Sequence, residues 1–271
     1  MSPVKAGPVG FGVGVDCQSC RENAGLSNEN TVGQQIHDQI LQSFRPYTEP
    51  DALNYVNSLV QKIAEKAQRR DLQYQATILY NEQIYATSAP GGAIYITTGF
   101  IYFLKNEAEL AGVLAHEIGE LQYKDPKFSR SHKVLNNLIE TGAAVAPAFG
   151  QIGMLAALGL AMVKSTTDGK EPTLEERLTK ADQQGMEYMA GAGQDPQGMI
   201  DLMYQFLNAE PEIVPYFKEY YQARPITVER MQAMQNTFKE LPIENRTFTT
   251  NREHFLEMTK GIREIYQDHR A

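Results

Sequence analysis

The sequence predicts an α+β fold that is mostly helical, with a small sheet of three or four strands. Two observations support this class. Residues 72–97 alternate between apolar and polar types and are rich in β-forming residues. The segments on both sides instead carry apolar residues at helical spacing. A chain of 271 residues with 42% hydrophobic residues is long enough to bury one substantial core or two smaller ones.

The N-terminal part divides into a leader and the start of the folded domain. Residues 1–27 begin with a Gly-rich stretch and are expected to form a flexible leader, with the domain covering residues 28–271. Apolar residues at helical spacing predict a first helix from Asn28 to Phe44. A second helix is expected after Thr48, with Pro50 in its first turn.

The sheet and the later helices follow in order. "LQYQATILY" predicts one strand, Ile84-Tyr85 a short second strand, and Ala93–Thr97 a third after a Pro90-Gly91-Gly92 turn. Residues 211–225 are expected to form a loop, whose Tyr216, Tyr220 and Tyr221 pack structurally or cover a cleft. The remaining segments have helical periodicity, at Glu107–Tyr123, Ser131–Ala144, Gly150–Lys164, Leu174–Gly191, Pro196–Leu207, Ile226–Glu240 and His254–Asp268.

Composition excludes some partners. The formal net charge is -8 and the pI is near 5.2, so a nucleic-acid partner is not expected, because phosphate binding needs clustered Lys and Arg. Residues 143–163 are apolar apart from Gln151 and long enough for a membrane span. Pro147 and the many small residues favour a helix inside a soluble core, so membrane association stays an alternative that we do not favour.

The two cysteines, Cys17 and Cys20, form a CxxC pair. A zinc ribbon would need a second such pair, and the sequence has none. We favour an exposed pair in the leader, with a small disulfide in an oxidising compartment as the alternative. Gly and Pro interrupt residues 1–16, so this stretch does not have the unbroken apolar core of a secretory signal.

One segment carries candidate chemistry, "NEAELAGVLAHEIGELQ" at residues 106–122. In zinc peptidases, HExxH places two His one helical turn apart on one face, and the Glu beside the first His is the general base. Here the pattern reads His116-Glu117-Ile118-Gly119-Glu120. Ionisable residues on an exposed helix face are common, but an apolar helix rarely carries three of them unless they have a role.

Three segments together resemble the M48 family of zinc metallopeptidases. They are "PGGAIYITTGFIYFLKNEAELAGVLAHEIGEL", "KADQQGMEYMAGAGQDPQGM" and "ARPITVERMQAM", and the resemblance covers about residues 28–240. It implies a zincin-like fold with the small sheet beside the HExxE helix. It also implies a protein or peptide substrate, bound as an added strand along a sheet edge. We expect that edge to be Ala93, Ile94, Tyr95, Ile96 and Thr97.

Transferred residue by residue, the resemblance gives a degenerate metal site. His116 matches the first zinc ligand and Glu117 the general base, whereas Glu120 replaces the second ligand, a His. Leu178 replaces the third ligand, a Glu, and Arg224 replaces the His of a His-Pro pair near the metal. A catalytic zinc keeps about three protein ligands and an open position, so we expect no cofactor here, and zinc only if the chain is active.

Two hypotheses address these replacements. Glu175 lies one helical turn before Leu178 and could supply a metal ligand if the helix were shifted. Alternatively, the Arg224 guanidinium enters the site and pairs with Glu117 or Glu120 in place of zinc. The other His residues are expected to be surface or structural ones, namely His37, His132, His254 and His269.

Two functions remain open at this stage. In the first, which we favour, the chain is a pseudo-peptidase that binds a protein or peptide without cleaving it. In the second, it is an active zinc metalloendopeptidase with an atypical site of His116, Glu120 and Glu175, and Glu117 as base. The resemblance favours a periplasmic or envelope location.

Overall fold

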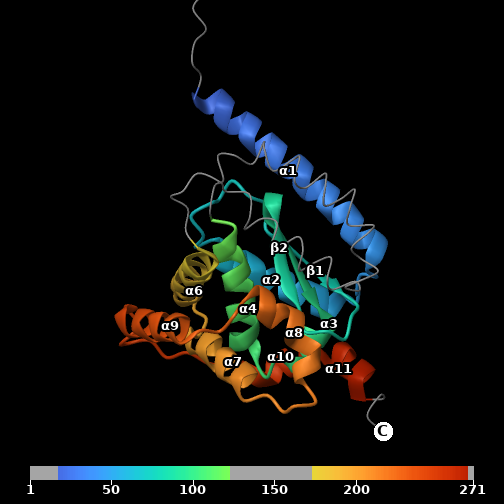
Figure 1. Ribbon diagram of the computed structural model, residues 1–271, viewed down its shortest axis with the longest axis vertical. Helices are drawn as coiled ribbons and strands as arrows, with labels where there is room; N and C mark the ends of the chain where they lie inside the picture. The colour runs from blue at the N-terminus through green and yellow to red at the C-terminus, as the bar shows by residue number, and fades with distance from the viewer. Residues whose placement is uncertain (1–17, 123–172, 268–271) are drawn as a thin grey trace, which may run out of the picture.

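The computed structural model describes residues 18–122 and 173–267, and the side chains of the first helix from residue 29 (Figure 1). The expected helices at 131–144 and 150–164, the apolar stretch 143–163, His132, His269 and Cys17 lie outside this description, as does the side chain of Cys20. The helices are α1 (Gln18–Ser43), α2 (Pro50–Ala64), α3 (Thr98–Phe103), α4 (Glu107–Glu120), α6 (Leu174–Gly191), α7 (Gln197–Leu207), α8 (Val214–Ala223), α9 (Val228–Glu240), α10 (Arg252–Met258) and α11 (Lys260–Gln267).

The described sheet has three strands, β1 (Gln75–Leu79), β2 (Ala86–Ala89) and β3 (Ala93–Thr97), in the order β1-β3-β2. β1 pairs parallel to β3, and β2 pairs antiparallel to β3. The mostly helical α+β class expected from the sequence is therefore confirmed. The three-residue 3-10 turn η1 (Pro90–Gly92) joins β2 to β3, and Gly91 and Gly92 have φ of 84° and 103°, which side chains rarely adopt.

The expectation that Ala93–Thr97 forms the sheet edge is wrong. Every residue of β3 is in register with a residue of β1, and four of its five residues also face β2. The physical reason is the tight turn, which fixes β2 on one side of β3 and leaves the other side for the parallel strand β1. The described edge strands are β1 and β2, and β2 is the one that contacts α4.

Helix α4 is the centre of the molecule and is buried along nearly its whole length. It begins at the N-cap Asn106, whose side chain accepts a hydrogen bond from the Glu109 amide. α6 and α7 cross it closely (Figure 1) because glycines stand at the contacts. A Cβ on Gly119 would lie 2.5 Å from the Ala181 carbonyl oxygen. These crossings bring residues of α6 next to the HExxE segment.

Three other segments differ from expectation. Residues 214–223 form helix α8 and not a loop; Pro215 stands in the first turn, where proline does not disrupt a helix. In this helix Tyr220 is buried, whereas Tyr216 and Tyr221 are exposed. The closing segment forms two short helices, α10 and α11, and α1 begins at Gln18, inside the expected leader. Within the described ranges, no helix is both long and apolar enough to cross a membrane.

Candidate functional site

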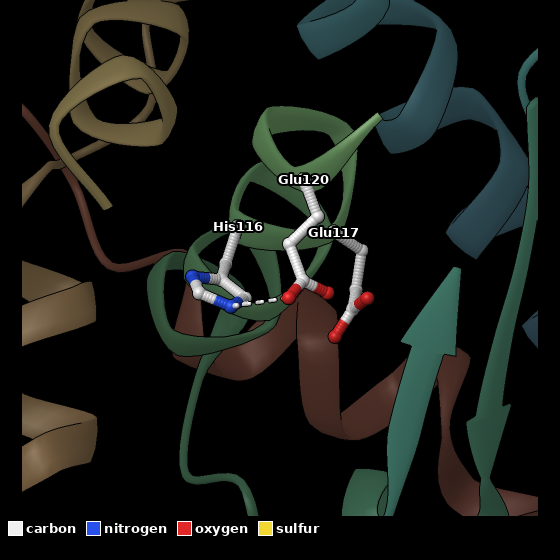
Figure 2. Close-up of side chains that lie close together, drawn as sticks. All are labelled: His116, Glu117 and Glu120. Carbon is white, nitrogen blue, oxygen red and sulfur yellow. Dashed lines mark ion pairs between the residues drawn. The ribbon is translucent and has the colours of Figure 1, made fainter. Parts of the chain in front are cut away.

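Three side chains of α4 form the centre of the site, His116, Glu117 and Glu120 (Figure 2). Each offers one possible ligand atom, and these atoms all lie within 4.8 Å of one another. His116 Nε2 is 3.9 Å from Glu120 Oε1, as expected for side chains one helical turn apart. His116 and Glu117 are buried and Glu120 is partly exposed. The structure therefore brings together the three residues that the HExxE pattern indicated.

The orientation of His116 is fixed from α6. Its Nδ1 lies 2.7 Å from Oδ1 of Asp182, which is fully buried. Burial acts to raise the pKa of Asp182, but Arg230 and His116 outweigh it and lower this pKa to about 2. The ionised carboxylate can accept a hydrogen bond from Nδ1, and this contact orients the ring with Nε2 toward Glu120. Nε2 is buried and has no hydrogen-bond partner among the described residues.

Arg230 of α9 anchors Asp182 and is a functional residue that the sequence reasoning missed. Its Nε donates to Oδ2 of Asp182 at 2.5 Å, and its Nη2 donates to Oδ1 at 3.0 Å. The side chain is 1% exposed. A single arginine on a helix carries no sequence signal, because most such residues are solvated.

The guanidinium of Arg224, which directly follows α8, occupies the space beside the two glutamates. Its Nη2 donates to Oε2 of Glu120 at 2.6 Å and lies 3.0 Å from Oε1 of Glu117. The guanidinium carbon stands 5.3 Å from the centre of the Tyr220 ring, a cation–π contact. Arg224 is itself buried, at 3% exposure. The pairing of Arg224 with the α4 carboxylates, expected from the sequence, is present in the structure.

The two glutamates respond differently to this environment. Burial raises the pKa of Glu117 to about 8, with Arg224 opposing the shift and the neighbouring Glu120 adding to it. Burial also acts to raise the pKa of Glu120, but Arg224 and His116 outweigh it and lower this pKa to about 2. At neutral pH one carboxyl therefore keeps its proton and the other is ionised beside the guanidinium.

The positions expected to supply a third metal ligand do not do so. Leu178 is buried on α6, one turn before Asp182, and an aliphatic side chain offers no donor atom. Glu175 is exposed, and its carboxylate accepts a hydrogen bond from Thr227 Oγ1 at 2.5 Å. Glu175 is therefore not part of the group that His116, Glu117 and Glu120 form in this structure. The reason is that Glu175 lies in the first turn of α6 and pairs with the segment before α9.

Comparison with known proteins identifies the family. The model of Peptidase family M48 matches residues 50–238, more than half of the chain. The chain belongs to peptidase family M48. It is similar to the beta-barrel assembly-enhancing protease of Escherichia coli (strain K12), with 24% identity over 188 residues, which cover 68% of this chain and 38% of that protein. The protein of the same name from Yersinia pestis is 24% identical over 228 residues, 80% of this chain and 45% of that one. The chain thus spans less than half the length of these relatives.

Zinc is the metal associated with the M48 family, and the donor atoms present here match it poorly. A catalytic zinc needs about three protein ligands, and His116 and Glu120 are the two that the described site offers besides the residue at the general-base position. One feature does match, because a buried Nε2 with Nδ1 fixed by a carboxylate is the arrangement of a metal-binding His. The other features do not, since both glutamates already pair with a guanidinium.

Proposed function

We propose that this M48 chain has lost zinc binding and proteolytic activity and acts by binding a protein or peptide. The observation that carries this proposal is the Arg224 guanidinium, which pairs with Glu117 and Glu120 inside the buried site. In an M48 peptidase these two positions would serve the metal and the attacking water. Here both glutamates pair with the guanidinium of Arg224, a cation that is part of the chain.

Electrostatics supports the loss of the metal. Two unit charges about 4 Å apart interact by roughly 4 kcal/mol at an effective dielectric constant of about 20, and a divalent ion doubles this. A zinc ion beside Arg224 would meet that repulsion, and Leu178 offers no compensating ligand.

The outer edge of β2 is the binding surface that we propose. We propose this edge in place of β3, which is the central strand of the described sheet and has no free edge. β2 contacts α4, and its Ser88 is close enough to Glu117 to act on the pKa of that carboxyl. In an antiparallel pair, hydrogen-bonded and non-hydrogen-bonded positions alternate along each strand. Tyr85, just before β2, is a hydrogen-bonded position, because Thr97 N donates to its carbonyl oxygen. The backbone groups of Ala86 and Ser88 therefore point away from β3. All four residues of β2 are buried, so an added strand would have to displace the atoms that cover this edge.

The class of partner and the location follow from the relatives. Their name describes a protease that enhances beta-barrel assembly, so a protein or an extended peptide is the partner that we propose. β-Barrel proteins of bacteria lie in the outer membrane, and an envelope location is part of the same proposal.

Metal content and cleavage test the proposal together. The purified chain, expressed with added zinc, should contain far less than one zinc per molecule by mass spectrometry and should not cleave casein. The triple substitution Glu120→His, Leu178→Glu and Arg224→His is the positive control, because it returns the family's residues to all three positions. Labelled unfolded casein should still bind to the wild-type chain by fluorescence anisotropy. Ala86→Pro, which removes an outward N–H, should weaken that binding.

A second function, an active metalloendopeptidase with His116 and Glu120 as ligands, is favoured by one observation. It is the buried Nε2 of His116, which is positioned as a metal-binding atom would be. Close to one zinc per chain, with casein cleavage that Glu117→Gln abolishes, would establish this function and refute ours.

A further inference from the structure

The buried charged residues of the site form a closed ring of contacts across four parts of the chain. Arg224 contacts Glu120 and Glu117 of α4, and His116 of the same helix contacts Asp182 of α6. Asp182 pairs with Arg230 of α9. Arg230 Nη1 closes the ring by donating to the carbonyl oxygens of Pro225, at 3.1 Å, and of Arg224, at 3.4 Å.

The connection between α8 and α9, residues 224–227, is bound to the rest of the site through the Arg224 side chain and through two backbone carbonyl groups. The Arg224 side chain reaches α4, and the backbone carbonyls of Arg224 and Pro225 accept from Arg230. Tyr220, one turn earlier on α8, packs its ring against the same guanidinium. These contacts lie inside the molecule, since Arg224, Arg230 and Tyr220 are all buried.

We propose that Arg224 is a structural cation that fastens the α8–α9 connection to α4. This inference rests on the proposed loss of zinc, because the guanidinium then performs the joining role of a metal ion. A bound metal draws ligands from separate elements together, and the folded state depends on it. Here the cation is part of the chain, so the connection stays ordered when all metal is removed. Arginine suits this role because its guanidinium stays charged when buried, and here its Nη2 contacts both carboxylates.

A double-mutant cycle in buffer with a metal chelator measures the coupling. Arg224→Met removes the cation that pairs with Glu120 and with the fully buried Glu117, and should lower the folding equilibrium constant at least about 100-fold. In the double variant Arg224→Met/Glu120→Gln, the folding equilibrium constant should fall at least about tenfold less than the product of the two single-variant decreases. Arg252→Met is the matched control, because Arg252 is exposed and, among the described residues, bonds only the Lys105 carbonyl. Its effect should add to that of Glu120→Gln.

Hydrogen–deuterium exchange gives the local readout. The amides of residues 220–227 should be protected in the chelator-treated wild type and should exchange at least about tenfold faster in Arg224→Met, relative to α2. An additive cycle or unchanged exchange overturns the proposal. If Arg224→Met does not fold, Glu120→Gln alone must accelerate exchange at residues 220–227, and wild-type rates there overturn the proposal equally. Zinc content and cleavage are measured separately, so failure of the proposed function is distinguishable from failure of this inference.

Discussion

At the scale of single residues, one guanidinium contacts two carboxyl groups, and these two groups differ in their distance from it, in burial and in protonation. Arg224 Nη2 is 2.6 Å from Glu120 and 3.0 Å from Glu117. Glu117 is fully buried and Glu120 is partly exposed. Two like charges so close together are unfavourable, and the proton therefore stays on the more deeply buried group. The pair balances the guanidinium without an additional cation.

This arrangement predicts a pH dependence of stability that Glu117→Gln removes. The pKa of Glu117 is raised from 4.5 to about 8 by burial, so between these values the folded state holds a proton that the unfolded chain has released. The free energy of unfolding contributed by this group is fully present below about pH 4.5 and is lost as pH rises through about 8. The neutral amide mimics the protonated acid. We therefore expect the variant to gain stability relative to wild type as pH rises from 5 to 9.

Urea unfolding at steps between pH 5 and pH 9, followed by circular dichroism, measures this difference. Glu253→Gln on α10 is the control because that carboxylate is exposed, and its curve should run parallel to the wild-type curve. If the Glu117→Gln curve also ran parallel to wild type, Glu117 would not hold its proton in the folded state.

At the scale of elements, close helix crossings at glycines position the site. α4 carries His116 and α6 carries Asp182, and the two helices meet where Gly119 faces the backbone of Ala181. A methyl group there would lie 2.5 Å from a carbonyl oxygen, which is too short for a carbon–oxygen contact. The helices would have to separate, and the His116–Asp182 contact would lengthen with them.

Gly119→Ala should therefore destabilise the fold by roughly 1–3 kcal/mol, the usual cost of overpacking a core. Gly191→Ala is the matched control, since it lies at the end of α6 and its methyl would meet only the flexible side chain of Lys66. Alanine there should be neutral or stabilise by up to about 1 kcal/mol, owing to its higher helix propensity. Chemical denaturation compares the two variants. Equal shifts would mean that the α4–α6 crossing is not tight at Gly119.

Sequence periodicity was sufficient for elements whose pattern is local. The predicted helix at 174–191 agrees with α6, and the predicted strand at 93–97 agrees with β3. It was insufficient where the outcome depends on distant partners. β3 is central because β1 pairs on its other side, a pairing between segments that are 18 residues apart in register. Residues 214–223 form a helix and not the expected loop, because Pro215 stands in the first turn, where proline is compatible with a helix.

At the scale of the whole molecule, the site joins segments that sequence reasoning could only partly assemble. The HExxE spacing placed His116, Glu117 and Glu120 on one helix face, and the family resemblance pointed to Arg224. Arg230 carried no such signal, because its role depends on the packing of α9 against α6. Charge pairs between distant elements become visible only when the fold brings the elements together.

Whether α1 belongs to the folded unit is also a question about the whole molecule. The family model begins at residue 50, after this helix, and so does not include it. Val32, Ile36 and Ile40 of α1 are at most 1% exposed and join the core. The Arg69 guanidinium forms a bidentate ion pair with the Glu29 carboxylate of this helix, with nitrogen–oxygen distances of 2.7 and 2.8 Å. These contacts are those of an integral element and not of a detachable one.

Ile36→Ala should therefore lower the stability of the whole domain and not only release α1. Truncating a buried isoleucine removes apolar contacts and leaves a cavity, at a cost of roughly 2–5 kcal/mol. Gln35→Ala, at the neighbouring exposed position, should change stability by less than about 0.5 kcal/mol. Thermal unfolding followed by circular dichroism should show one transition, shifted to lower temperature only for Ile36→Ala. Two separate transitions, or an unshifted one, would mean that the domain folds independently of α1.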